Sequence, residues 1–158
     1  MNNYELLLEE AEKNNIIVRE VTLKSDAKGL YVDGKIALNT SKLSTVAEKN
    51  CIMAEELAHH YTSYGNIIDD SKIENVKQER LARKLAYENL VDLKQVADLV
   101  INHNLNKYEI IEKLDVTEGF FNDAIEYYSQ KYGVHKDFEN YSIIFYPHLA
   151  VLKKNLKL

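Results

Sequence analysis

The sequence predicts an α+β fold that is mostly helical, with a small three-stranded sheet placed before its main helices. Between residues 16 and 39, β-branched and apolar residues come in short runs, and Asp33-Gly34 separates the last two of these runs. An Asp-Gly pair between apolar runs is a strong signal for a tight hairpin turn. On both sides of this region apolar residues recur every three or four positions, as they do in amphipathic helices.

The helices are expected on both sides of the predicted sheet, and capping residues mark their ends. Ser44 and Thr45 can cap the long helix that follows the sheet, and Gly65 can end it. Asp70 or Ser71 can cap the helix after that. The expected ranges are residues 4–14, about 46–64, about 71–91 and 93–132, the last as a series of shorter helices. The segment 134–158, which holds the only proline, is left unassigned.

Length and composition are those of one globular domain, expected to span residues 1–158. Apolar residues make up 46% of the chain and charged residues 28%, which is ordinary for a folded protein. The single cysteine, Cys51, cannot form an internal disulfide, and the first residues lack the pattern of a signal peptide. A cytoplasmic location is therefore expected. The longest apolar run is too short to cross a membrane, so no membrane association is expected.

Charge argues against direct nucleic-acid binding. The formal net charge is −5, whereas duplex binding relies on clustered Lys and Arg. Residues 107–128 have the spacing of a helix-turn-helix, but the second helix would carry Glu118, Asp123 and Glu126 and no basic residue before its end. We expect this helix to have a packing role, and an acidic helix that binds a basic protein domain is the alternative.

The chemistry-bearing pattern is Glu55-Glu56-Leu57-Ala58-His59 in the predicted helix 46–64. Glu55 and His59 are four residues apart, so their side chains share one face of a helix, close enough to bind one ion. In zinc peptidases with His-Glu-x-x-His, two histidines at this spacing hold the metal and the glutamate between them is the general base. Here Glu55 stands at the first histidine position, and a carboxylate is an accepted zinc ligand.

A catalytic zinc needs a third protein ligand, and Glu79 is the candidate. It lies in the predicted helix 71–91, which a short spacer would fold back against the first helix, and Ala82, one turn later, would allow close approach. Two carboxylates and one imidazole would neutralise the charge of the ion and weaken it as a Lewis acid. Glu56 would be the general base. A carboxylate-rich site also suits manganese or iron.

Two other interpretations of the same pattern stay open. Glu-Glu-x-x-His is also common on solvated acidic helix faces that bind nothing. In addition, Glu56 and His60 form a second pair at the same spacing, a register that would leave Leu57 where the base should be.

Three segments resemble the ImmA/IrrE family of metallopeptidases, especially those of phages and mobile elements. They are IMAEELAHHYTSYGNI (residues 52–67), ERLARKLAYE (79–88) and YEIIEKLDVTE (108–118), and the likeness runs from about Gly29 to Gly133. The resemblance implies a zincin-like fold, Zn²⁺ as cofactor, and Glu79 as third ligand. The sequence departs from the family's first histidine at Glu55.

The resemblance also implies a function, which is cleavage of a regulatory partner protein, typically a helix-turn-helix repressor. The alternative is a catalytically inert relative that binds a repressor or another protein without cutting it. The predicted strand 35–38 comes directly before the site helix, so its edge is a candidate for holding an extended substrate; the alternative is an inner strand. Tyr61 and Tyr64 are candidates for oxyanion stabilisation, with packing as the more ordinary role.

Overall fold

The computed structural model describes residues 1–62 and 72–154, with side chains from residue 75 onward in the second range. Its fold is mixed α+β, as predicted. Contacts divide the chain into two compact units, Met1–Leu90 and Val91–Leu158. The expectation of one domain over the whole chain stays a prediction.

The first unit begins with helix α1 (Asn3–Lys13). The Asn2 side chain accepts a hydrogen bond from the Glu5 backbone N–H at 2.9 Å, and the Glu5 carboxylate accepts one from the Asn2 N–H at 2.9 Å. This reciprocal capping satisfies two of the amide groups that a helix start leaves without partners. After the helix, Asn15 turns the chain with a φ of 57°, which leads directly into the first strand.

The sheet of the first unit has three strands, β1 (Ile17–Val21), β2 (Gly29–Val32) and β3 (Lys35–Asn39), as the sequence predicts. Their order is β1-β3-β2, with β3 parallel to β1 and antiparallel to β2. Asp33 and Gly34 both have positive φ, 45° and 74°, as the predicted hairpin turn requires. The strand containing residues 35–38 is therefore the central one, which contradicts its use as an edge; β2 is the edge strand on that side.

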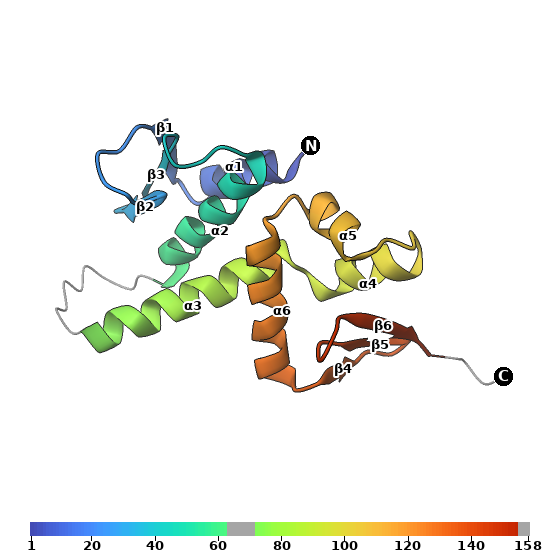
Figure 1. Cartoon of the computed structure of the whole chain (residues 1–158). Coiled ribbons are helices and arrows are strands. Elements are labelled where there is room, and N and C mark those ends of the chain that lie inside the picture. Colours follow the sequence, from blue (N-terminus) through green and yellow to red (C-terminus); the bar gives the residue numbers. More distant parts are fainter. Residues whose placement is uncertain (63–71, 155–158) are drawn as a thin grey trace. The chain divides into compact units, whose positions relative to one another are not determined.

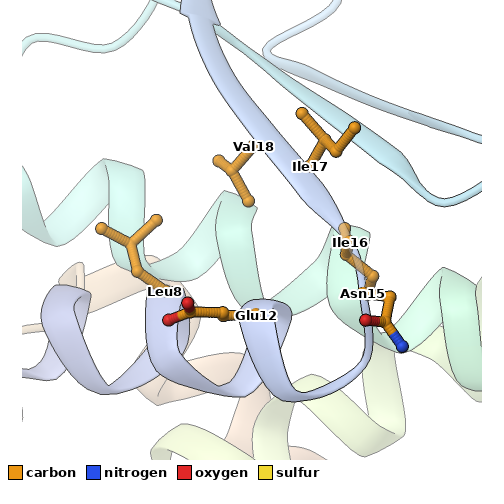
Figure 2. Close-up of a pocket in the computed structure, with 6 residues that line it drawn as sticks. All are labelled: Leu8, Glu12, Asn15, Ile16, Ile17 and Val18. Atoms are coloured by element: carbon orange, nitrogen blue, oxygen red, sulfur yellow. The ribbon is translucent and has the colours of Figure 1, made fainter.

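The two faces of this sheet differ. Ile36 and Leu38 are buried on the inner face, against which α1 and the following helix pack. Figure 2 shows how β1 alternates: the side chain of Val18 points toward Leu8 of α1, while Ile17 points away to the other face. A hollow of about 450 Å³ lies at this junction and is lined by Leu8, Glu12, Asn15, Ile16, Ile17 and Val18.

Two long helices complete the first unit, α2 (Val46–Thr62) and α3 (Lys72–Leu90). The predicted cap of α2 is confirmed, since Thr45 Oγ1 accepts from the Glu48 N–H at 3.1 Å. The helices lie side by side (Figure 1). The caps expected at Gly65, Asp70 and Ser71, and the last residues of the predicted helix 46–64, lie outside the described residues.

Residues 91–154, the described part of the second unit, form three helices and another sheet. The helices are α4 (Leu93–Ile101), α5 (Lys107–Leu114) and α6 (Glu118–Tyr132), within the range predicted as helical. Strands β4 (His135–Asp137), β5 (Tyr141–Ile144) and β6 (Ala150–Lys153) form an antiparallel sheet in that order. The sequence did not predict this second sheet. Its strands are only three or four residues long, too short for a clear period.

The inner face of the first sheet should dominate the stability of its unit. Leu38 is completely buried, whereas Leu30, on the outer face, is 49% exposed. We expect Leu38→Ala to lower the free energy of unfolding by about 2–5 kcal/mol, because it opens a cavity that cannot collapse fully. Leu30→Ala should cost about 1 kcal/mol or less. Urea unfolding followed by circular dichroism measures both, and equal losses would contradict the assignment of faces.

Candidate metal centre

Helix α2 presents two rows of functional side chains. Glu55 and His59 are four residues apart and share one face, while Glu56 and His60 share the neighbouring face. A buried stripe of apolar residues fixes this orientation by packing into the first unit; it consists of Met53, Ala54, Leu57 and Ala58. With this stripe buried, the row with His59 meets α3 and the row with Glu56 meets β2.

The first row meets α3. His59 Nε2 lies 3.4 Å from Glu79 Oε1, and these two side chains are 21% and 56% exposed. The two helices pack together, and both carry buried small residues, which allow close packing of helices; they are Ala54, Ala58, Ala82 and Ala86, each at most 3% exposed. Ala82 is buried, and its predicted role in the close approach of the helices stays a prediction. The structure brings together two of the three predicted ligands, His59 and Glu79.

Glu55, the third predicted ligand, is half-buried one turn before His59. Its negative charge is among the causes that raise the pKa of Glu56, so it lies within electrostatic reach of that carboxylate. Across residues 1–62 and 72–154, as far as they are described, no three His, Cys, Asp or Glu side chains converge into a metal-binding group. Glu55, His59 and Glu79 are residue types that zinc accepts, and Glu55 and His59 share one helix face.

Glu56 lies in an environment that disfavours its charge. Burial raises its pKa most, and the negative charges of Glu55 and Glu79 raise it further, to about 7; a hydrogen bond from the Tyr31 backbone N–H acts in the opposite direction. The carboxylates of Glu55 and Glu79 thus act electrostatically on Glu56, and His59 pairs with one of them, Glu79. A bound cation would relieve this repulsion.

Glu56 also lies against the free edge of β2. The Lys28 carbonyl accepts from the Asn39 N–H at 2.9 Å, which fixes the phase of the ladder between β2 and β3. Ladder hydrogen bonds alternate along an edge strand, so the backbone groups of Gly29 and Tyr31 point away from β3. The Glu56 carboxylate accepts a hydrogen bond from the Tyr31 N–H. A Cβ on Gly29 would lie 2.9 Å from Glu56 Oε1 and 2.5 Å from Ile52 Cγ2. Only glycine permits this approach.

His60 is held by Tyr31. The Tyr31 hydroxyl is 2.7 Å from His60 Nδ1, their rings meet edge to face, and the hydroxyl accepts from the Gly34 N–H at 3.2 Å. His60 therefore connects α2 to the hairpin and does not face Glu79. Sequence reasoning missed Gly29 and Tyr31 as neighbours of the site. The sequence spacing could have indicated them, because Gly29 and Tyr31 share one face of β2, and Glu56 and His60 share one face of α2.

Tyr61 turns away from the site. Its hydroxyl donates to Glu10 Oε1 at 2.7 Å and accepts from Asn14 Nδ2 at 3.0 Å, so it ties α2 to α1. Burial and the Glu10 carboxylate raise the pKa of Tyr61 to about 12. This position favours the packing role over oxyanion stabilisation. Tyr64 lies outside the described residues.

Searches against protein-family models, curated proteins and solved structures returned no match. No helix in the described part of the chain is both long and apolar enough to cross a lipid bilayer. The family resemblance therefore stands on the sequence segments alone.

Replacing Glu56 by Gln should stabilise the metal-free protein at high pH. The folded pKa of about 7 lies above the unfolded value of 4.5, so the native state holds more protons between them and loses stability as pH rises through this window. At pH 8 the neutral amide should gain on the order of 2–3 kcal/mol, and near pH 4 the two proteins should be equal. Urea unfolding from pH 4 to 8 tests this; a difference that does not grow with pH would contradict it.

Replacing Gly29 by Ala should destabilise the first unit by about 1–3 kcal/mol, because the added methyl group overpacks against Ile52 and Glu56. Gly119, in α6, is a matched control, since a Cβ there meets nothing within 4 Å. Gly119→Ala should be neutral or stabilise by up to about 1 kcal/mol. Thermal unfolding of both variants provides the comparison, and an unchanged Gly29→Ala protein would show that Glu56 does not lie against β2.

Proposed function

We propose that this protein is a cytoplasmic zinc-dependent endopeptidase that cleaves a regulatory protein. The observation that carries the proposal is the meeting of His59 and Glu79 from two separate helices at 3.4 Å, as the sequence pattern predicts. Two further features support it: Glu56 follows Glu55 on α2, and the free edge of β2 lies beside Glu56. Together these are the parts of a hydrolytic site.

Glu55, His59 and Glu79 would hold the metal. Their oxygen and nitrogen atoms are ligands that zinc accepts, and two carboxylates balance the charge of a divalent ion. When bound, zinc supplies Lewis-acid activation of the attacking water and polarisation of the scissile carbonyl. Because the donor set is rich in carboxylates, manganese or iron is the alternative ion.

Glu56 would move the protons. Its carboxylate accepts a proton from the attacking water and donates it to the leaving amine, which is general base and then general acid catalysis. The Tyr31 N–H holds the Glu56 carboxylate at the strand edge. Glu56 shares a helix face with His60, which meets Tyr31, whereas His59 meets Glu79 on the neighbouring face. In this proposal Glu56 would act beside the ligands without being one of them.

The free edge of β2 would bind the substrate. An extended peptide can pair with the outward backbone groups of Gly29 and with the Tyr31 carbonyl, as peptides do in strand addition. The Tyr31 N–H stays with Glu56. This pairing would run the substrate past Glu56. We therefore propose β2 as the substrate-binding edge in place of residues 35–38, which lie in the central strand β3.

The substrate class rests on the resemblance to the ImmA/IrrE family, which implies a helix-turn-helix repressor. The net charge of −5 is compatible with a basic DNA-binding protein as partner, since complementary charge speeds encounter. The second candidate function is an inert protein that binds such a repressor without cutting it. The carboxylate at Glu55 favours this candidate, because it weakens the Lewis acid.

The variant Glu56→Gln separates the two functions. With zinc supplied, the wild-type protein should generate new peptide termini in a proteome-derived protein mixture, detected by mass spectrometry. Glu56→Gln should lower this activity by at least about 100-fold, because proton transfer contributes about 10²–10⁴. The variant should still bind the metal. Termini produced equally by both proteins would sink the mechanism, and no termini from a zinc-loaded wild type would favour the inert binding protein.

A further inference from the structure

The outer face of the sheet β1-β3-β2 carries exposed apolar side chains. Its largest apolar side chains are Ile17, Leu30 and Val32, which are 48%, 49% and 51% exposed in the whole chain. The strand register places them together with Ala37, because Ile17 pairs with Lys35, Lys35 with Val32, and Ala37 with Leu30. An apolar sheet face is usually covered by another layer, and an exposed apolar patch often marks an interaction site.

A hollow on this face gives it the form of a binding surface. Its volume is about 320 Å³, and Ile17, Leu30, Val32 and Ala37 are among the residues that line it. One end of the face is closed by the chain's own loop. There Asn39 is fully buried and its amide donates to the Ala27 carbonyl at 2.8 Å. The exposed apolar part of the sheet face is therefore limited to the area around the hollow.

The charges around the hollow are mainly positive. Arg19 and Lys35 line it, and Lys28 lies on the same face by the alternation along β2; Asp33, at the hairpin turn, is the one carboxylate among the lining residues. In a chain with a net charge of −5, this local excess of cations stands out. An apolar floor with basic flanks complements an apolar stripe with acidic flanks.

The dimensions fit a helix. Three strands at about 4.8 Å spacing give a face about 10–14 Å wide, close to the 10–12 Å diameter of an α-helix. A five-residue strand is about 16 Å long, which is the length of about 11 helical residues. One helix of about three turns would therefore cover the exposed apolar side chains.

We propose that this sheet face binds an acidic amphipathic helix of a partner protein. The proposal is independent of the metal centre, because Glu55, Glu56, His59 and Glu79 lie on α2 and α3 and not on this face. A second copy of the chain is a poorer occupant. A two-fold dimer places a patch against itself and would bring Arg19 and Lys35 close to their own copies.

The test uses the full chain and a labelled synthetic peptide of about four helical turns, with leucines on one stripe and glutamates on both flanks. A control peptide carries lysines in place of the glutamates. Fluorescence anisotropy at low salt should show binding of the acidic peptide and at least about tenfold weaker binding of the basic one, since each 1.4 kcal/mol of charge preference is tenfold. Failure of the acidic peptide to bind, or equal binding of both, overturns the proposal.

Variants locate the binding face. Val32→Glu should weaken binding of the acidic peptide by at least about tenfold, because the helix would bury an unpaired carboxylate. Leu30→Gln is the milder second variant and should act in the same direction. Leu152→Gln, which removes a 55% exposed leucine from β6, should leave affinity unchanged. Circular dichroism verifies folding. Unchanged binding by both sheet variants, or a dimer in light scattering that Val32→Glu breaks, overturns the proposal.

Discussion

The packing of α2 against α3 is the interaction on which the candidate site depends. Both helices carry buried alanines, and small buried side chains let packed helix backbones come close, so that flanking side chains can meet. His59 and Glu79, one from each helix, lie 3.4 Å apart. A larger residue at Ala58 or Ala82 would separate the helices and break the pairing without touching a ligand. The geometry of the site is thus a consequence of packing.

The second constraint is electrostatic. Glu55, Glu56 and Glu79 lie near one another, and burial adds to their repulsion at Glu56, where the pKa rises to about 7. Carboxyl groups whose pKa is raised by burial and by neighbouring charges are concentrated at functional sites of proteins. A divalent cation would convert the repulsion into attraction, and the Tyr31 N–H keeps Glu56 in place at the strand edge. This unfavourable cluster is the electrostatic support for the proposed metal site.

Local sequence signals predicted most elements because they act over a few residues. The Asp33-Gly34 turn and the Thr45 cap are such signals, and the i, i+4 spacing placed Glu55 and His59 on one face. What sequence could not predict depends on contacts between distant segments. Strand order, which makes β2 the edge, is one case, and the closeness of Gly29 to Glu56 is another. The short strands β4 to β6 gave no period to detect.

The most direct test of the account is the metal content of untagged protein purified without chelator, measured by inductively coupled plasma mass spectrometry with His59→Ala and His60→Ala as a matched pair. His59 faces Glu79 and His60 faces Tyr31. The account predicts about one zinc per chain in the wild type and in His60→Ala, and loss of zinc in His59→Ala. Absence of metal from the zinc-supplied wild type, or loss with His60→Ala alone, would contradict it.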